Sequence, residues 1–303
     1  MRLPDTAEKS FWHYLNERHR IYLRRSAGAP LPWTSDPIFQ QYKFTNVFRE
    51  LDRTTIWVRE NIRKPLAGEL ELLLFNTALF RQTGASEGWQ GIVRKFSPSK
   101  HAAKYVAAQH AGVKVFTGAY MVTGQFPGAK GNNKVVSLFE HALLPVWKAR
   151  RRLVEVCLDT NSLQAFVAEL GCFVGWRGNN FMAYEVACDL LHTQLLGNAC
   201  DQFTWANPGP GAQRGLSRIF GGEINMLRGA RSREREQSIA EMRQLLAQTP
   251  KKLGKHFDGA FPIDMRVIEN ALCETDKYER TRLGQGRPRS RYAGDGGLVG
   301  KTR

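Results

Sequence analysis

Apolar side chains recur at the spacing of an α-helix along most of this chain, and this periodicity constrains the fold more than any other feature. Residues 7–25 illustrate it, because aromatic and aliphatic side chains gather near one face while arginines populate the others. Further helices are expected over residues 68–82, 98–111, 136–157, 161–174, 179–196, 234–248 and 264–280. The sequence therefore predicts a mainly α-helical protein.

Capping signals set the expected helix boundaries. The Ser35-Asp36-Pro37 sequence is typical of a helix start, and Ser97 and Asn161 are expected to act as further caps. The helix that begins near Asp36 is expected to carry Tyr42, Phe44, Asn46, Arg49 and Glu50. The best strand candidate is residues 113–124, and loops rich in glycine and asparagine are expected at 124–134 and 206–215.

The composition changes near the C-terminal end of the sequence. Residues 1–280 fit one large helical domain or two packed helical lobes. Residues 281–303 are rich in glycine and arginine and poor in apolar side chains, so they are expected to stand apart from the core. They are either a disordered end or a basic tail that contacts phosphate, and one segment can be both.

Charge and apolar content narrow the class of protein. The 44 Lys and Arg residues against 28 Asp and Glu give a formal charge of +16, which attracts polyanions such as nucleic acids. No apolar run approaches the roughly 20 residues that a membrane span needs, and charges interrupt the first residues, so we expect a cytoplasmic protein without a membrane partner. The five cysteines contain no C-x-x-C pair, which disfavours disulfides and zinc.

A glycine-rich turn followed by a helix is the sharpest local motif. Gly171, Gly175 and Gly178 precede the apolar run that begins at Phe181. This order is similar to the helix-hairpin-helix of DNA glycosylases, which presents backbone amides to a phosphate and an acidic residue, about a dozen positions downstream, to the active site. Asp189 lies at that offset. A tight connection between two helices is the structural alternative.

Two carboxylates follow on the same expected helix. Glu185 and Asp189 are four residues apart, so a helix places both on one face, and His192 follows three residues later. Such a cluster suits acid–base chemistry, and a solvated charged face is the alternative. Apolar residues around the pair keep the catalytic interpretation open, because desolvation would raise the pKa of Asp189 towards a useful range.

A proline–glycine loop with two arginines predicts an anion site. The loop contains Asn207, Gly209 and Gly211, and it is followed by Arg214 and Arg218 at the start of the next helix. Exposed amides and guanidinium groups suit phosphate or pyrophosphate, and glycine permits the close backbone approach that a phosphate needs. The alternative is a simple connection between helices with its arginines on a solvated surface.

Aromatic residues beside arginines near the N-terminus leave two interpretations open. Tyr42 and Phe44 lie close in sequence to Arg49 and Arg53. Such groups suit a flipped base and its phosphates. Equally, the aromatic residues could anchor the core while the arginines form ordinary ion pairs.

Six segments occur in a fixed order along the chain. They are Phe11-Trp12, Pro32-Trp-Thr-x-Asp-Pro37, Phe44-Thr-Asn46-Val-x-Arg49-Glu50-x-Asp52-Arg53-Thr54, Phe181-Met-Ala-Tyr-Glu185-x-x-x-Asp189, Asn207-Pro-Gly-Pro-Gly211-x-x-Arg214-Gly215 and Glu269-Asn-Ala-Leu-Cys273-Glu274-x-Asp276-Lys277-Tyr278. Together they resemble the α-glutamyl/putrescinyl thymine pyrophosphorylase family, also called amino acid:DNA transferases, and the related helical domain named after 5-hydroxymethyluracil DNA kinase. The resemblance covers residues 11–289.

This resemblance implies an all-helical, DNA-glycosylase-like fold encoded by tailed phages and acting in the host cytoplasm. The substrate would be double-stranded DNA carrying 5-hydroxymethyluracil, activated as a pyrophosphate ester by a hydroxymethyluracil DNA kinase. An amino acid or polyamine nitrogen would then replace the pyrophosphate. The Walker A pattern G-x-x-x-x-G-K-[ST] does not occur, so a P-loop kinase is not expected. No cofactor is expected either, and Mg²⁺ would assist only by screening pyrophosphate.

That chemistry needs a base for the amine and stabilisation of a departing polyanion. Asp189, with Glu185, is the candidate base. The leaving group is assigned to Arg177, Asn207, Arg214 and the amides around Gly209 and Gly211. The base or the incoming carboxylate is assigned to Asn46, Arg49 and Arg53, while Glu274, Asp276 and Lys277 are either site residues or an ion-paired structural end.

Two other functions remain as alternatives. One is a DNA glycosylase that uses Asp189 to remove a modified base, which would leave an abasic site where a transferase keeps the glycosidic bond. The other is a non-catalytic helical DNA-binding subunit of a modification complex.

Overall fold

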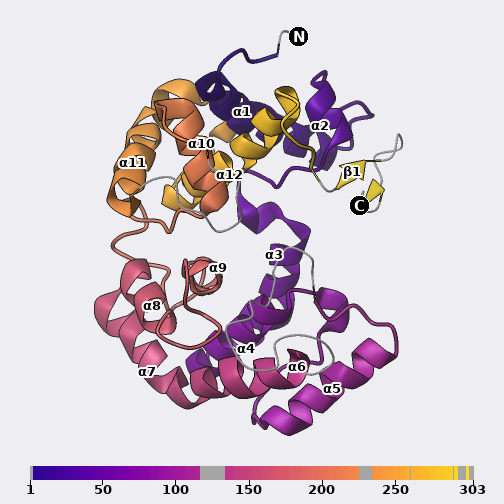
Figure 1. Ribbon diagram of the computed structural model, residues 1–303, viewed down its shortest axis with the longest axis vertical. Coiled ribbons are helices and arrows are strands. Elements are labelled where there is room, and N and C mark those ends of the chain that lie inside the picture. Colours follow the sequence, from indigo (N-terminus) through magenta and orange to yellow (C-terminus); the bar gives the residue numbers. More distant parts are fainter. Residues whose placement is uncertain are drawn as a thin grey trace. The chain divides into compact units, whose positions relative to one another are not determined.

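The computed structural model is mainly helical, as the apolar periodicity predicts (Figure 1). It describes residues 3–116, 134–224, 234–259, 261–288, 290–292 and 298–299. The chain divides into two compact units, here called unit 1, residues 1–52 and 206–303, and unit 2, residues 53–205. Unit 1 therefore contains two separate stretches of the chain, and unit 2 is the continuous segment between them.

Unit 1 is organised around one long helix near the end of the chain. This helix, α12, contacts α1, α10 and α11 and buries apolar residues such as Ile268 and Leu272. The helices of unit 1 are α1 (Ala7–Ser26), α2 (Pro37–Gln41), η1 (Arg49–Leu51), α10 (Pro210–Phe220), α11 (Arg235–Lys252), η6 (Lys255–Phe257) and α12 (Met265–Arg282). The two short strands β1 (Arg291–Tyr292) and β2 (Leu298–Val299) pair antiparallel.

A buried carboxylate joins three of these helices. Asp36 caps α2 by accepting from the Ile38 amide, and it also accepts from the Tyr278 hydroxyl of α12 at 2.8 Å. His13 of α1 lies 2.7 Å from the same carboxylate. Burial raises the pKa of Asp36, but hydrogen bonds from His13, Tyr278 and the Ile38 amide outweigh it and bring the pKa below its ordinary value.

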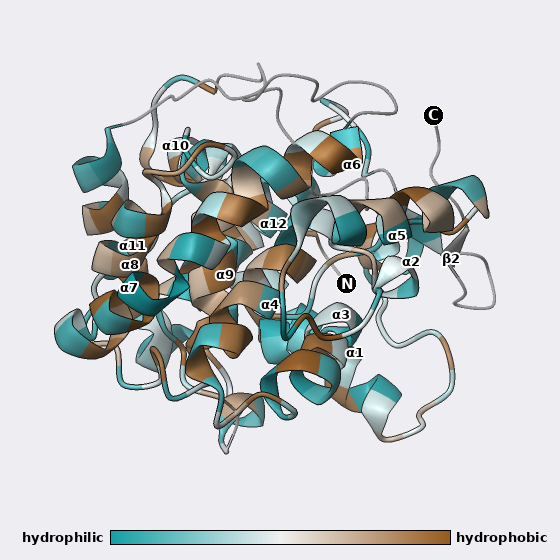
Figure 2. Ribbon diagram, turned by 90° about the horizontal axis from the view of Figure 1, so that it is seen from below, coloured by the Kyte–Doolittle hydropathy of each residue, from teal (hydrophilic) through white to brown (hydrophobic). Residues whose placement is uncertain are grey.

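Unit 2 is organised around α4, whose residues 73–83 are all buried. A helix that is buried on every side must be covered by several neighbours, and α4 contacts both α7 and α9. Figure 2 shows hydrophobic and hydrophilic residues alternating along α7, as expected of a helix with one buried face. The helices are α3 (Arg53–Val58), η2 (Arg59–Arg63), α4 (Leu70–Thr83), η3 (Ser86–Gly88), α5 (Pro98–His110), α6 (Lys134–Ser137), η5 (Leu138–Leu143), α7 (Leu144–Thr160), α8 (Leu163–Leu170) and α9 (Phe181–Leu190).

The predicted second helix is wrong beyond its first turn. The helix α2 ends at Gln41, and Tyr42 is extended with φ −121° and ψ 145°. Side chains bind the following backbone: the amide of Thr45 donates to Glu274 of α12 at 3.1 Å, and that of Asn46 donates to nearby Asp52 at 3.0 Å. These hydrogen bonds compete with helical ones and keep the segment open.

Several predicted boundaries also differ. Helix α10 begins at Pro210, inside the predicted loop 206–215, because proline is well suited to the first turn of a helix. Ser97 makes no capping hydrogen bond, and Asn161 ends α7 in the left-handed region with φ 44°. The cap of α8 is instead Ser162, with Asp201 accepting from the amides of Leu163 and Gln164.

Two other predicted features fall only partly within the described residues. Of the strand predicted at 113–124, Phe116 forms an isolated antiparallel bridge with Gly84. Residues 117–124, and most of the predicted loop 124–134, lie outside the described residues. The described part of residues 281–303 packs on unit 1 instead of standing apart from it. Its contacts include the Lys43 amide donating to the Ser290 carbonyl and a bridge between Tyr42 and Arg291.

Candidate active site

Helix α9 of unit 2 presents Glu185 and Asp189 one turn apart, as predicted, and both carboxylates meet the same arginine. Arg81 of α4 donates from Nε and Nη2 to the two oxygens of Asp189, at 2.6 Å each. Its Nη1 donates to Glu185 Oε2 at 2.9 Å. One guanidinium group therefore fixes both candidate acid–base residues.

The three groups differ in their access to solvent. The side chains of Asp189 and Arg81 are 0 % and 2 % exposed, whereas that of Glu185 is 15 % exposed. The bidentate guanidinium stabilises the ionised form of Asp189, which opposes the effect of burial alone. Glu185 is thus the more solvent-accessible of the two carboxylates.

Arg81 was not among the residues expected from the sequence. Its helix, LELLLFNTALFRQT, is strongly apolar, and Arg81 occupies a position on a face that the fold buries. A buried arginine requires an acidic partner. An arginine embedded in an apolar helix is therefore the signal in the sequence that could have indicated a buried ion pair.

The predicted glycine turn connects α8 to α9 and is held against α4. Gly175 and Gly178 have φ of 85° and 100°, a region that favours glycine. The Gly175 carbonyl accepts from the side chain of Gln82, the neighbour of Arg81 on α4, at 3.1 Å. Arg177 is exposed on this turn. The similarity of the turn to a glycosylase hairpin stays a prediction, and His192 lies beyond the end of α9.

In unit 1, α10 and α12 approach each other through glycines. A Cβ atom at Gly215 would lie 2.4 Å from the carbonyl oxygen of Leu272, and one at Gly211 would lie 2.5 Å from Sγ of Cys273. Both glycines therefore serve the packing of α10 on α12, and the predicted role of Gly211 in phosphate binding stays a prediction. The Gly209 amide also has a partner already, because it donates to Glu269 at 3.3 Å. One amide of the predicted cradle is thus bound by a side chain of α12.

The arginines that follow this loop converge on α12. Arg214 and Arg218, one turn apart on α10, donate from Nε to the two oxygens of Asp276 at 2.9 and 3.0 Å. Arg280 of α12 lies 3.2 Å from the same carboxylate through its Nε. Asp276 is fully buried. Three guanidinium groups thus surround one carboxylate. The sequence indicated two of these arginines, Arg214 and Arg218.

The remaining predicted binding residues make local contacts. The Asn46 side chain donates to the Leu51 carbonyl at 2.9 Å, and Arg49 pairs with Asp52. Lys277 pairs with Glu274 on α12 and donates to the Lys43 carbonyl at 3.2 Å. Asn207 is buried in unit 1, whereas Arg53 is exposed at the start of α3 in unit 2. Asn46, Arg49 and Lys277 therefore help to hold the extended segment that follows α2.

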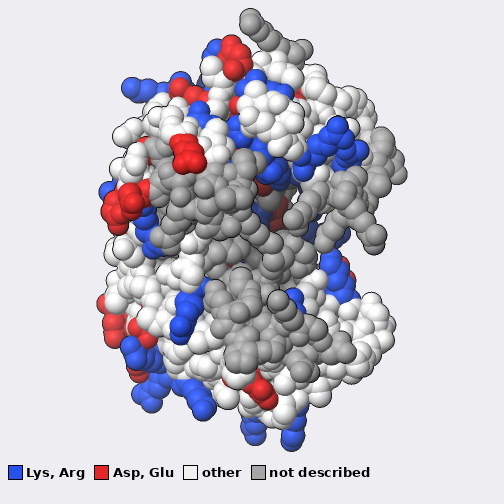
Figure 3. Space-filling model, viewed as in Figure 1, with Lys and Arg blue, Asp and Glu red and all other residues white. Residues whose placement is uncertain are grey.

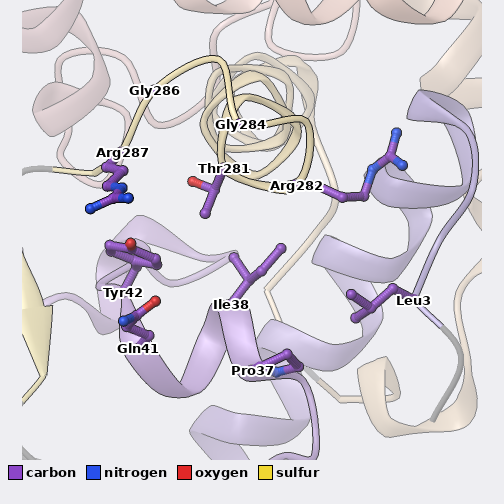
Figure 4. A pocket seen from close by; sticks show the side chains of 10 residues that line it. All are labelled: Leu3, Pro37, Ile38, Gln41, Tyr42, Thr281, Arg282, Gly284, Gly286 and Arg287. Atoms are coloured by element: carbon purple, nitrogen blue, oxygen red, sulfur yellow. The ribbon is translucent and has the colours of Figure 1, made fainter.

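A groove of about 460 Å³ opens in unit 1 between α2 and the end of α12. Figure 4 shows Gln41, Tyr42 and Arg287 together on one side of it, with Ile38 and Thr281 between them and Leu3. None of the predicted site residues lines this groove. It is therefore a feature that sequence reasoning missed, because it depends on the turn after α12 folding back towards α2.

Charge is distributed over both units. On the face drawn in Figure 3, Lys and Arg side chains occur throughout and are interspersed with Asp and Glu. Within the described residues, no group of three or more His, Cys, Asp or Glu side chains could hold a metal ion. The described helices include none that is long and apolar enough to cross a membrane.

Comparison with known proteins places these features in a family. The chain matches the family described as "5-hmdU DNA kinase, helical domain" over residues 6–287. The chain belongs to this family. It is also 28 % identical over 304 residues to a protein of Bacillus phage SP10 described as "5-hmdU DNA kinase". The match covers 91 % of this chain but only 46 % of that relative. No solved structure matches the chain.

Family membership confirms part of the predicted resemblance. The six segments pointed to the helical domain named after the 5-hydroxymethyluracil DNA kinase, and the family match spans all of them. The chain corresponds to less than half of the kinase from phage SP10. The narrower assignment to the thymine pyrophosphorylases, or amino acid:DNA transferases, stays a prediction.

Proposed function

We propose that the chain is an amino acid:DNA or amine:DNA transferase of phage thymine hypermodification. It would act on DNA in which 5-hydroxymethyluracil has been converted to a pyrophosphate ester, and it would replace the pyrophosphate by a nitrogen nucleophile. Membership of the 5-hmdU DNA kinase helical-domain family over residues 6–287 carries this proposal. Absence of the Walker A pattern from the sequence supports a step other than phosphoryl transfer from a nucleotide.

The proposed reaction is a substitution at the exocyclic methylene carbon of the base. The amine nitrogen forms a bond to this carbon while the bond between the carbon and the pyrophosphate oxygen breaks. The amine loses one proton to a general base, and pyrophosphate leaves with the electron pair. Such a step gains from a positioned base and from cationic groups near the departing oxygens.

Glu185 is the residue that we assign as the general base. Its carboxylate is partly exposed, whereas Asp189 is fully enclosed and holds the Arg81 guanidinium through both oxygens. Asp189 would then act as a positioning residue, because it fixes the arginine that in turn fixes Glu185. This assignment revises the sequence-based prediction, in which Asp189 was the main base. Exposed Arg177, on the turn before α9, is the cationic group that we assign to the departing pyrophosphate in unit 2.

Mass spectrometry of nucleosides tests the function. The full chain is incubated with DNA that carries the pyrophosphate ester and with a pool of amino acids and polyamines. We expect a new nucleoside whose mass equals that of the base with the amine in place of pyrophosphate. Release of a free base with abasic sites would instead support the glycosylase alternative, and bound but unaltered DNA would support a non-catalytic subunit.

A second measurement tests the base. Glu185→Gln should fold normally and lose about 10²-fold or more in turnover, since it removes the proton acceptor but keeps the shape. Glu155→Gln is the matched control, because Glu155 is an exposed carboxylate of unit 2 that pairs with Arg151. A folded Glu185→Gln protein with full turnover would remove Glu185 from the mechanism.

A further inference from the structure

We propose that the arginines around Asp276 form a binding site for a phosphate oxyanion within unit 1. The site comprises Arg214 and Arg280 as the contacting residues, with Arg218 and Asp276 as positioning residues. The choice of phosphate chemistry rests on the proposed function. The charge, orientation and burial of these arginines support an anion site whether or not the proposed function holds.

The charges of the cluster do not balance. Three guanidinium groups carry three positive charges and Asp276 supplies one negative charge, so two positive charges are left without compensation inside the cluster. The acidic neighbours on α12 are engaged elsewhere, because Glu274 pairs with Lys277 and Glu279 pairs with Arg282. Like charges held this close together repel one another, and a bound anion would relieve that repulsion.

The orientation of the guanidinium groups leaves their donor-rich ends available. Arg214 and Arg280 both approach Asp276 through Nε, and their terminal nitrogens have no hydrogen-bond partner among the described residues. The terminal nitrogens of a guanidinium form the fork that binds phosphate oxygens in pairs. Because both Nε atoms lie within 3.2 Å of the same Asp276 oxygen, they are at most about 6 Å apart. One phosphate group is therefore within reach of both forks.

Burial separates the contacting residues from the positioning residues. The side chain of Arg218 is 3 % exposed, and its Nη2 donates to Gln285 at 2.8 Å. The side chains of Arg214 and Arg280 are 15 % and 26 % exposed, so both can meet a ligand from solvent. Asp276 holds Arg214 and Arg218 by accepting hydrogen bonds from their Nε atoms, and this preorganisation lowers the entropic cost of binding.

Two sources could supply the phosphate. One is free pyrophosphate after its release from the activated base, and the other is the backbone of the DNA. The first probe is inorganic pyrophosphate, titrated into the full chain by isothermal calorimetry. The second is a short unmodified DNA duplex, measured by fluorescence anisotropy. Neither measurement needs an amine or activated DNA, so failure of the transferase proposal would not alter the result.

The variants Arg280→Ala and Arg214→Ala remove one fork each and leave Asp276 with two partners. We expect each to weaken binding of the probe that occupies the site by about 10-fold or more, the value of a lost hydrogen bond to a charged group. Arg280→Lys should give a smaller loss, because lysine keeps the charge but not the fork. Arg20→Ala is the matched control, since it removes one guanidinium from unit 1 that pairs with Glu17 instead.

The pattern of losses decides both the site and its source. Loss confined to pyrophosphate assigns the leaving group, and loss confined to the duplex assigns the backbone; either supports the site. The proposal is overturned if Arg214→Ala and Arg280→Ala, shown by thermal unfolding to be folded, bind both probes as tightly as the wild type. It is overturned equally if Arg20→Ala weakens binding as much as they do.

Discussion

A single buried arginine in unit 2 sets the positions of two carboxylates by hydrogen bonding to both of them. Arg81 meets Glu185 and Asp189 from a different helix, so the identity of one residue on α4 sets the geometry of a pair on α9. The sequence predicted the pair, because a spacing of four residues places both on one helix face. It did not predict Arg81, because contacts between helices that are distant in sequence depend on the tertiary packing.

Removal of this arginine should destabilise unit 2. Arg81→Met leaves Asp189 buried without its bidentate partner, and we expect a loss of about 3–5 kcal/mol in the free energy of unfolding. Denaturant titration measures it. Arg151→Met is the control, with an expected change below about 1 kcal/mol, because Arg151 is exposed and pairs with an exposed glutamate. Equal stabilities of the two variants would show that the buried pair adds nothing.

A buried histidine makes stability depend on pH in unit 1. Burial, followed by the nearby charge of His256, lowers the pKa of His19 from 6.5 to about 4. The folded state therefore keeps His19 neutral while the unfolded chain binds a proton below pH 6.5, so stability is full above this value and falls as the pH drops towards 4. We expect the wild type to lose unfolding free energy more steeply over this range than His19→Gln. Parallel curves in pH-dependent denaturation would contradict the assignment.

At the scale of elements, the close approach of α10 to α12 positions the arginine cluster. Gly215 faces the Leu272 backbone, and this contact brings Arg214 and Arg218 within reach of Asp276. A side chain at residue 215 would force the helices apart, since backbone cannot move aside as a flexible side chain can.

Gly215→Ala should therefore be costly. We expect it to lower the free energy of unfolding by about 1–3 kcal/mol, measured by denaturant titration, and to weaken phosphate binding with it. Gly68→Ala is the control, because a Cβ at Gly68 meets nothing within 4 Å and its φ is not in the left-handed region. A Gly215→Ala protein as stable as Gly68→Ala would show that α10 and α12 can separate without loss.

Helices could be predicted well from the sequence and their ends less so. The periodicity placed α1, α4, α5 and α12 within a few residues, because apolar faces are local information. The segment after Asp36, which was predicted to be helical, and the loop before α10 share one feature that the sequence did not predict. In both, a carboxylate from α12 binds the backbone, Glu274 at Thr45 and Glu269 at Gly209. Such partners lie far away in sequence, and no local pattern reveals them.

At the scale of the whole molecule, the excess of basic residues is expected to govern affinity for DNA. The formal charge of +16 predicts binding to duplex DNA. Binding releases counterions from the DNA, and because this release becomes less favourable at higher salt, the affinity should fall as salt is added. For about six phosphate contacts, affinity should fall roughly 10³-fold between about 50 and 200 mM salt. Fluorescence anisotropy with an unmodified duplex measures this, and heparin should displace the DNA. Affinity that stays constant over this salt range would show that the charge does not act through DNA phosphates.

The discontinuous composition of unit 1 has a consequence for biosynthesis. Unit 2 is complete once residue 205 has left the ribosome, so it can fold while translation continues. Helix α1 is synthesised before unit 2, yet it packs against α12, which is synthesised more than 200 residues later. The apolar face of α1, with Phe11, Tyr14 and Leu15, therefore lacks α12 throughout this interval, which makes it a natural binding site for a chaperone.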